Sequence, residues 1–234
     1  VADYGDYNVN HPTLTETNTW DFAVMQGHGD ESSALGDAVA FRTNALALYQ
    51  RIRAHGSGKG ADAKAVLLQT WARGAGASLY PGTFASPEAM QAEIDGNTVM
   101  ATNAIAAAEG SDRVRLATAG AAFAMGGFDP ATLFAANLST PGGAGPELVA
   151  LTLYKAIYGG LATDIAYDSA NAAGLTGISE RDWQRITRWA DGLPAPEPQA
   201  PAPGARRVFL LDACGNAGGS PVYNGWNYKT FSAT

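Results

Sequence analysis

Cysteine and histidine are scarce in this chain, and their scarcity excludes several kinds of site. The 234 residues include one cysteine, Cys214, which excludes an internal disulfide and a metal site built from several cysteines. The three histidines, His11, His28 and His55, are far apart, and no His-x-x-x-His pair is present. We therefore expect no metal and no other cofactor.

Charged residues are also few, and long apolar runs are missing. Charged residues make up 16% of the chain and the formal net charge is -7, which does not favour a nucleic acid or an anionic membrane as partner. No apolar run approaches the ~20 residues that span a bilayer. The chain begins at Val1 with no signal peptide, and we expect it to be a fragment or a processed chain.

Short apolar segments alternate with amphipathic ones, which predicts an α/β fold with a doubly wound parallel sheet and helices on both faces, in three α/β/α layers. We expect strands over 20–26, 63–71 and 113–119. A helix is predicted over 34–54, with an inward face formed by Leu35, Val39, Leu46, Tyr49 and Ile52.

Capping signals mark the starts of the later helices. Ser86-Pro87 and Asp129-Pro130 each place a side-chain cap before a proline at the first helical position. The helix after Ser86 has a predicted buried stripe of Met90, Ile94, Thr98, Ala101 and Ile105. Further helices are expected over 147–158, and from Ser179 to near Gly192.

A proline-rich segment divides the chain. We expect an α/β domain over 1–192 whose N-terminal part is missing, then a semi-rigid linker over 193–205 with five prolines. Residues 206–234 open with the strand-like run Arg206–Asp212 and form a short β-rich appendage. Two interpretations of this appendage stay open: the start of a second module, or a strand docked on the same sheet.

Residues 133–154 carry a resemblance to the last motif block of SGNH/GDSL-type ester hydrolases. Relatives have a pattern similar to Leu-Tyr-x-Asp-Asp-x-x-His-Pro-Ser-x-x-Gly-x-Tyr-Leu. Pro141, Gly145 and Leu148 match the frame of that pattern. Asn137 stands at an acidic position and Thr140 at the histidine position, and threonine cannot accept a proton near neutral pH. The resemblance therefore implies an SGNH- or flavodoxin-like fold with a degenerate dyad.

A second block, residues 20–26, resembles the Trp-Asp-Tyr-Val-Val-Leu-Gln strand of several SGNH subfamilies. By this resemblance Gln26 takes the oxyanion position, where a side-chain amide donates to developing negative charge. The alternative is that Gln26 only ends a buried strand. The resemblance covers about residues 14–192, in which the blocks follow the family's order.

The nucleophile block of the family has no counterpart here. The family places its serine in a Gly-Asp-Ser or Gly-Asn-Ser turn well before the Trp-Asp strand, and the residues before Trp20 contain no serine. Ser32, Ser33 and Ser139 are loop serines without a motif. Candidate ligand-binding residues are His28 and Asp30, after the first strand, and Tyr80 and Phe84, on a Pro/Gly loop. The alternative for His28 and Asp30 is that they lie in a solvated polar loop. The alternative for Tyr80 and Phe84 is that they pack in the core.

Three functional hypotheses remain open at this stage. The first is an SGNH-like hydrolase of acyl or acetyl esters, including those of carbohydrates, in a secreted or periplasmic protein; the Pro-rich linker favours it. The second is a non-catalytic SGNH-like domain that binds glycans or acts as a scaffold in a secreted multidomain protein; the residues at 137 and 140 favour it. The third is an unrelated doubly wound domain. Expected partners are small-molecule or carbohydrate esters.

Overall fold

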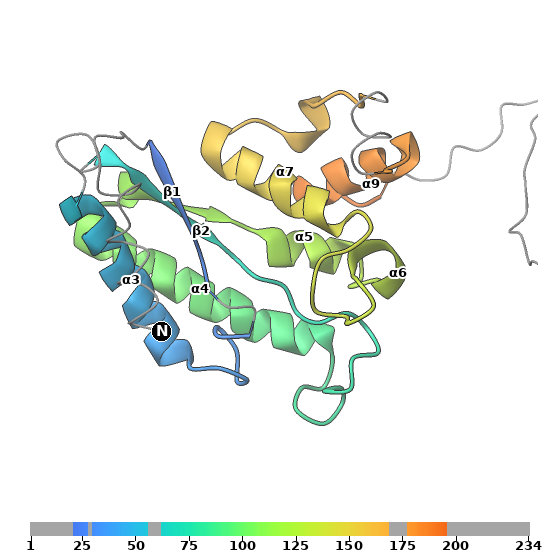
Figure 1. Ribbon diagram of the computed structural model, residues 1–234, viewed down its shortest axis with the longest axis horizontal. Coiled ribbons are helices and arrows are strands. Elements are labelled where there is room, and N and C mark those ends of the chain that lie inside the picture. Colours follow the sequence, from blue (N-terminus) through green and yellow to red (C-terminus); the bar gives the residue numbers. More distant parts are fainter. Residues whose placement is uncertain (1–20, 28–29, 56–61, 169–176, 196–234) are drawn as a thin grey trace, which may run out of the picture. The chain divides into compact units, whose positions relative to one another are not determined.

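The computed structural model describes residues 21–27, 30–55, 62–168 and 177–195, and within them it contains a parallel sheet and helices (Figure 1). The elements are β1 (Phe22–Gln26), α3 (Ala38–His55), β2 (Lys64–Leu68), α4 (Pro87–Glu109), η2 (Ser111–Arg113), β3 (Val114–Ala117), α5 (Ala119–Met125), α6 (Pro130–Leu133), α7 (Gly145–Tyr158), η3 (Ala162–Asp164) and α9 (Glu180–Ala190).

The sheet has the strand order β1-β2-β3, and both strand pairs are parallel. In the register Val24 lies beside Val66, and Val66 lies beside Arg115. The predicted parallel α/β sheet is thus confirmed. Among the described residues, successive strands are added in one direction across the sheet. A doubly wound sheet reverses that direction at one point, so the doubly wound topology stays a prediction.

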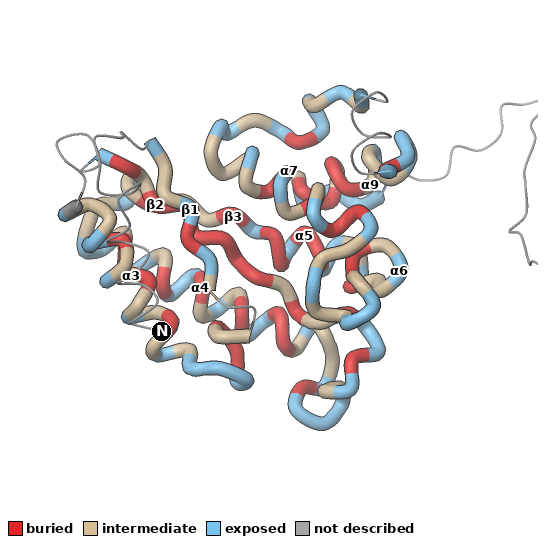
Figure 2. Tube along the Cα trace, viewed as in Figure 1, coloured by how far each residue is buried: buried red, intermediate tan, exposed pale blue. Residues whose placement is uncertain are grey.

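Helices cover both faces of the sheet, which gives three layers (Figure 1). On one face α3 and α4 bury a cluster that includes Met25, Leu67 and Tyr49, and the Tyr49 hydroxyl donates to the carbonyl of Ala63 at 2.7 Å. On the other face α7 packs against Val66 and Leu68 of β2. The burial pattern in Figure 2 shows β2, the central strand, almost entirely buried.

The larger core lies beyond the ends of the strands, among α4, α5, α7 and α9. Its members include Ile94, Phe123, Phe128 and Leu148, each with 0% exposure. A fully buried side chain of this size stabilises the fold by about 1.5–3 kcal/mol. This core supports the loops that follow the strands, where the candidate site lies.

The capping signals predicted helix starts correctly. The Ser86 hydroxyl accepts a hydrogen bond from the Ala89 amide, Pro87 begins α4, and every residue of its predicted stripe is buried. The Asp129 carboxylate accepts from the Ala131 amide ahead of α6. The Ser179 hydroxyl caps α9 in the same way.

The inward face predicted for the first helix was partly wrong. Leu35 is 42% exposed and Val39 is 64% exposed, whereas Phe41 and Tyr49 are buried. The helix begins at Ala38, because the Asp37 carboxylate accepts the amides of Val39 and Ala40 and acts as the cap. A start four residues later than predicted leaves Leu35 in the preceding loop.

Several predictions lie on residues outside the described ranges. By its contacts the chain divides into the units Val1–Pro196 and Glu197–Thr234, and the described residues all belong to the first unit. The residues outside the described ranges include the predicted β-rich appendage, most of the predicted linker, His11, His28 and Cys214. Within the described part of the chain, no helix has both the length and the apolarity to cross a membrane.

Candidate functional site

The carboxyl ends of the three parallel strands lie at one edge of the sheet, and the segments after them form the candidate site. Gln26 ends β1, is exposed, and lies beside Leu68 at the end of β2. Its exposed amide is available to a ligand, which fits the oxyanion position that the resemblance implies. That role stays a prediction.

The loop over 134–144 is closed by its own backbone. The Ala135 amide donates to the Thr140 carbonyl at 2.9 Å, and the Gly142 amide donates to the Leu133 carbonyl at 3.0 Å. A Cβ at Gly142 would lie 2.4 Å from the Ala135 nitrogen, so no other residue fits there without a shift of the backbone. This segment is therefore a tight turn that leads into α7.

The two residues that the resemblance assigns to the dyad positions, Asn137 and Thr140, bind each other. The Asn137 amide nitrogen donates to the Thr140 hydroxyl at 2.9 Å. The Asn137 side-chain oxygen accepts the backbone amides of Ser139 at 3.1 Å and Thr140 at 2.9 Å. Both side chains are exposed. This is an Asx-type turn, in which the polar groups of Asn137 stabilise the loop.

Segment 71–75, which follows β2, holds this loop against the end of the sheet. The indole nitrogen of Trp71 donates to the Ser139 carbonyl at 2.9 Å, and the Gly74 amide donates to the Leu138 carbonyl at 2.8 Å. The Trp71 ring stacks on Phe123 with centroids 5.0 Å apart. Asn137 and Thr140 therefore lie near the carboxyl end of β2, at the edge where a ligand of such a sheet binds.

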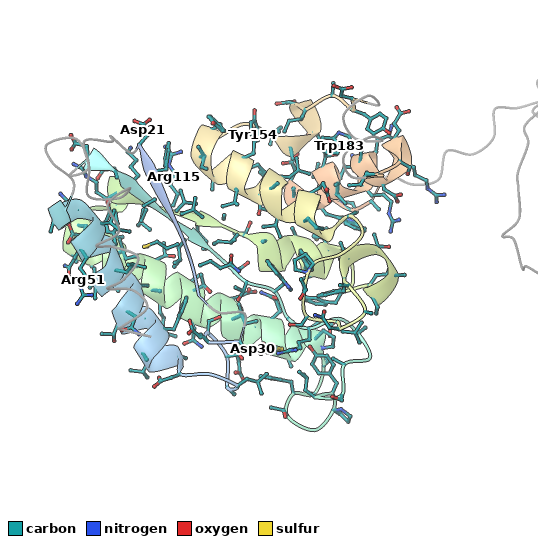
Figure 3. All side chains as sticks on the ribbon, viewed as in Figure 1. Asp21, Asp30, Arg51, Arg115, Tyr154 and Trp183 are labelled. Atoms are coloured by element: carbon teal, nitrogen blue, oxygen red, sulfur yellow. The ribbon has the colours of Figure 1, made fainter. Side chains whose placement is uncertain are left out.

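An ion pair joins the loops after β1 and β2. An Arg73 guanidinium nitrogen donates to the Asp30 carboxylate, and their side chains are 30% and 21% exposed. The Arg73 Nε is buried without a hydrogen-bond partner among the described residues. Figure 3 labels Asp30 in the loop after β1. This partly exposed pair offers both a cationic donor and an anionic acceptor to a polar ligand.

Tyr80 supports the same pair from the loop between β2 and α4. Its hydroxyl donates to the Arg73 carbonyl at 3.0 Å. Burial, followed by the nearby Glu88 carboxylate, raises the pKa of Tyr80 to about 12. Tyr80 therefore stays protonated at neutral pH and acts as a hydrogen-bond donor, rather than as a base.

Gln91 on α4 was not among the predicted site residues, yet it organises the end of β2. Its side-chain oxygen accepts the Ala72 amide at 2.7 Å, and its nitrogen donates to the Thr70 carbonyl at 3.3 Å and to Asp95 at 2.7 Å. Burial raises the pKa of Asp95, while the Gln91 hydrogen bond opposes that change. The only signal in the sequence was a polar residue beside the apolar stripe of α4.

The other candidates differ in their access to a ligand. Phe84 is 4% exposed and packs in the large core, which argues against direct ligand contact. His28 lies outside the described residues. Ser32 and Ser33 are buried, and the Ser33 hydroxyl donates to the Asp30 carbonyl at 2.9 Å. In the described ranges, no three histidine, cysteine, aspartate or glutamate side chains are grouped to hold a metal ion.

The comparisons with known proteins bear on the fold. No protein-family model matches the chain, and no curated protein does. A protein from Slackia heliotrinireducens, described as a candidate SGNH hydrolase, aligns at 23% identity over 67% of this chain and 78% of its own, with a TM-score of 0.49. A DUF4886 family protein from Bacteroides uniformis aligns at 17% identity over 77% of this chain, with a TM-score of 0.58.

At these identities the likeness concerns the fold alone. The aligned region spans 64% of the length of the Bacteroides protein. The likeness to the Bacteroides protein supports the α/β fold of this chain. Activity and substrate are not part of that likeness.

Proposed function

We propose that this chain is a non-catalytic SGNH-like domain that binds a carbohydrate or its ester at the carboxyl edge of the sheet. The observation that carries the proposal is the hydrogen bond between Asn137 and Thr140. Positions that hold an acid and a base in the hydrolases are used here to close a turn. Neither side chain takes a proton at neutral pH, so neither activates a nucleophile.

The serines of the described site support the same conclusion. Ser33 is buried and already donates to a backbone carbonyl, and Ser32 is 2% exposed. A serine nucleophile needs a neighbouring base within about 3.2 Å. The Ser33 hydroxyl instead donates to the Asp30 carbonyl.

The ligand class follows from the polar groups at the edge. The Arg73–Asp30 pair presents donors and acceptors together, which suits neighbouring sugar hydroxyls, since each hydroxyl both donates and accepts. The exposed Gln26 amide adds a donor and an acceptor suited to an ester carbonyl. We include a secreted or periplasmic location in the proposal, as part of a multidomain protein.

Titration calorimetry with an acetylated oligosaccharide, followed by NMR of the same sample, tests this function. We expect saturable binding and no release of acetate. Asp30→Asn should weaken the binding, whereas Asp62→Asn serves as a matched control, because Asp62 pairs with Arg113 before β2 and β3, at the amino edge of the sheet. Absence of binding to acetylated and unacetylated oligosaccharides alike would contradict the carbohydrate assignment.

A second candidate function is ester hydrolysis with a nucleophile supplied by chain outside these residues. The observation in its favour is that Gln26 is exposed at the end of β1, as an oxyanion donor needs to be. This candidate predicts acetate release once an upstream segment with a Gly-Asp-Ser or Gly-Asn-Ser turn is included. The non-catalytic proposal predicts binding without release from that longer chain as well.

A further inference from the structure

The turn before α7 contains the triplet Asn137-Leu138-Ser139, which has the form Asn-x-Ser/Thr. The other asparagines of the 234-residue sequence have no serine or threonine two positions later. A triplet of this form, with a middle residue other than proline, is the acceptor sequence for an N-linked sugar, and the sugar needs a place at the surface. The structure provides that place, because Asn137 is exposed.

The middle residue anchors the triplet, while the asparagine stays accessible. Leu138 is partly buried and packs against the large core, and its carbonyl accepts the Gly74 amide at 2.8 Å. Asn137, the residue before it, is exposed. The loop is therefore held in place by Leu138 and presents Asn137 to solvent, where the active site of a transferase can reach it.

The Asn137 side chain can carry a sugar without losing its place in the turn. Its nitrogen has two hydrogens, and one of them is donated to the Thr140 hydroxyl at 2.9 Å. The second hydrogen has no acceptor among the described residues. Its oxygen accepts the amides of Ser139 and Thr140, and an N-linked sugar leaves that oxygen unchanged. Replacement of one hydrogen is thus compatible with the Asx-type turn.

The Ser139 hydroxyl has no part in holding the described fold together. The Ser139 amide donates to Asn137 and its carbonyl accepts from Trp71, whereas the hydroxyl has no hydrogen-bond partner within the described ranges. By contrast, the hydroxyls of Ser33, Ser86 and Ser179 are each hydrogen-bonded. A free hydroxyl two positions after the asparagine is the group by which an enzyme recognises such a triplet.

We propose that Asn137, in the folded loop, is an acceptor for an N-linked sugar from a glycosyl diphosphate. The Asn137 nitrogen forms a bond to the anomeric carbon of the sugar, and the bond from that carbon to the diphosphate oxygen breaks. The diphosphate leaves with the electron pair, and the amide proton passes to a base of the transferase. A lipid-linked oligosaccharide and a nucleoside diphosphate sugar share this reacting bond. The inference goes beyond the proposed function and does not depend on it.

Two incubations of the folded 234-residue chain test the proposal. One contains an oligosaccharyltransferase that reads Asn-x-Ser/Thr and a lipid-linked oligosaccharide, and the other contains a soluble N-glycosyltransferase and a nucleoside diphosphate glucose. Mass spectrometry of the denatured, digested product should show one sugar unit or chain at Asn137, and the incubation that succeeds identifies the donor. Reversible binding of an oligosaccharide adds no mass after denaturation, so this result and the calorimetric one are independent.

Two substitutions at the third position of the triplet provide the controls. Ser139→Ala should accept no sugar, whereas Ser139→Thr should still accept it. Ser139→Ala should unfold at the same urea concentration as wild type, because the hydroxyl that it removes has no partner among the described residues. The proposal is overturned by a wild-type chain that stays unmodified in both incubations, or by one that is modified only after denaturation. Equal transfer to Ser139→Ala would also overturn it, because the triplet would then not be what the enzyme recognises.

Discussion

The Asn137 side-chain amide donates a hydrogen bond to the Thr140 hydroxyl at 2.9 Å, across the turn that precedes α7. The Asn137 oxygen meanwhile accepts two backbone amides of the same turn. The resemblance of residues 133–154 to SGNH hydrolases implies that these positions hold an acid and a base in those enzymes. Here they contribute to the stability of a loop, and the chemistry of a general base is lacking.

We expect Asn137→Ala to destabilise the protein by about 1 kcal/mol, because two backbone amides lose their acceptor on an exposed loop. Thr140→Ala removes only the hydroxyl and should cost less. Urea unfolding followed by circular dichroism measures both. Equal stability of Asn137→Ala and wild type would show that the turn does not depend on this side chain.

Gly120 should not tolerate a side chain. An added Cβ would lie 2.0 Å from the Gln91 amide nitrogen and 2.3 Å from the Thr70 carbonyl. Gly120→Ala is expected to cost about 1–3 kcal/mol through this overpacking, measured by thermal or urea unfolding. Gly96→Ala is the control: Gly96 lies within α4 with nothing near its Cβ, so alanine there should stabilise the helix by about 0.5–1 kcal/mol.

Gln91 is expected to be a structural requirement of the site. Gln91→Ala leaves the Ala72 amide of a buried segment without the side-chain acceptor that Gln91 supplies, at a cost of about 1–3 kcal/mol. Asn103→Ala is the matched control, because it removes a side-chain amide from the exposed side of α4, and it should change stability by less than about 0.5 kcal/mol. Comparable unfolding midpoints for the two variants would contradict this account.

Asp191 should make stability depend on pH in the acid range. Burial raises the pKa of its carboxyl, but hydrogen bonds from Lys155, Ala162 and Thr163 outweigh burial and lower the pKa from 3.8 to about 2. A lowered native pKa contributes stability that is present above the unfolded value and is lost as pH falls through the native one. The stability gap between wild type and Asp191→Asn should therefore narrow between pH 3.8 and about 2. A difference in stability between wild type and Asp191→Asn that does not vary with pH would contradict the lowered pKa of Asp191.

The ion pair after β1 and β2 should matter for binding more than for folding. Asp30→Asn is expected to lower the affinity for an oligosaccharide by about tenfold, the loss of one charge-assisted hydrogen bond. Its effect on unfolding should be within about 1 kcal/mol, because the pair is partly exposed. A large loss of stability without a change in affinity would assign Asp30 a structural role alone.

Local signals in the sequence were sufficient for much of the fold. The Ser86-Pro87 cap and the stripe from Met90 to Ile105 predicted α4, because cap and periodicity are properties of neighbouring residues. The tight loop and helix after Leu133 were also predicted. The α5 segment, Ala-Gly-Ala-Ala-Phe-Ala-Met, was missed because it is small and apolar throughout and shows no polar face.

The site was harder to predict, because it is built from contacts between distant segments. Arg73 and Asp30 are 43 residues apart, and Trp71 meets the carbonyl of Ser139 across 68 residues. No spacing rule connects such positions. The sequence identified Asn137 and Thr140 as candidate site residues, but only the structure shows that their side chains bind each other.

The central proposal, that the site of this chain is non-catalytic, is tested most directly by hydrolysis of p-nitrophenyl acetate. The measurement compares the purified chain with the double variant Asn137→Ala, Thr140→Ala. We predict that both proteins give the same rate as buffer with an inert control protein. A rate above that background that is lost in the double variant would contradict the claim and place catalysis at this loop.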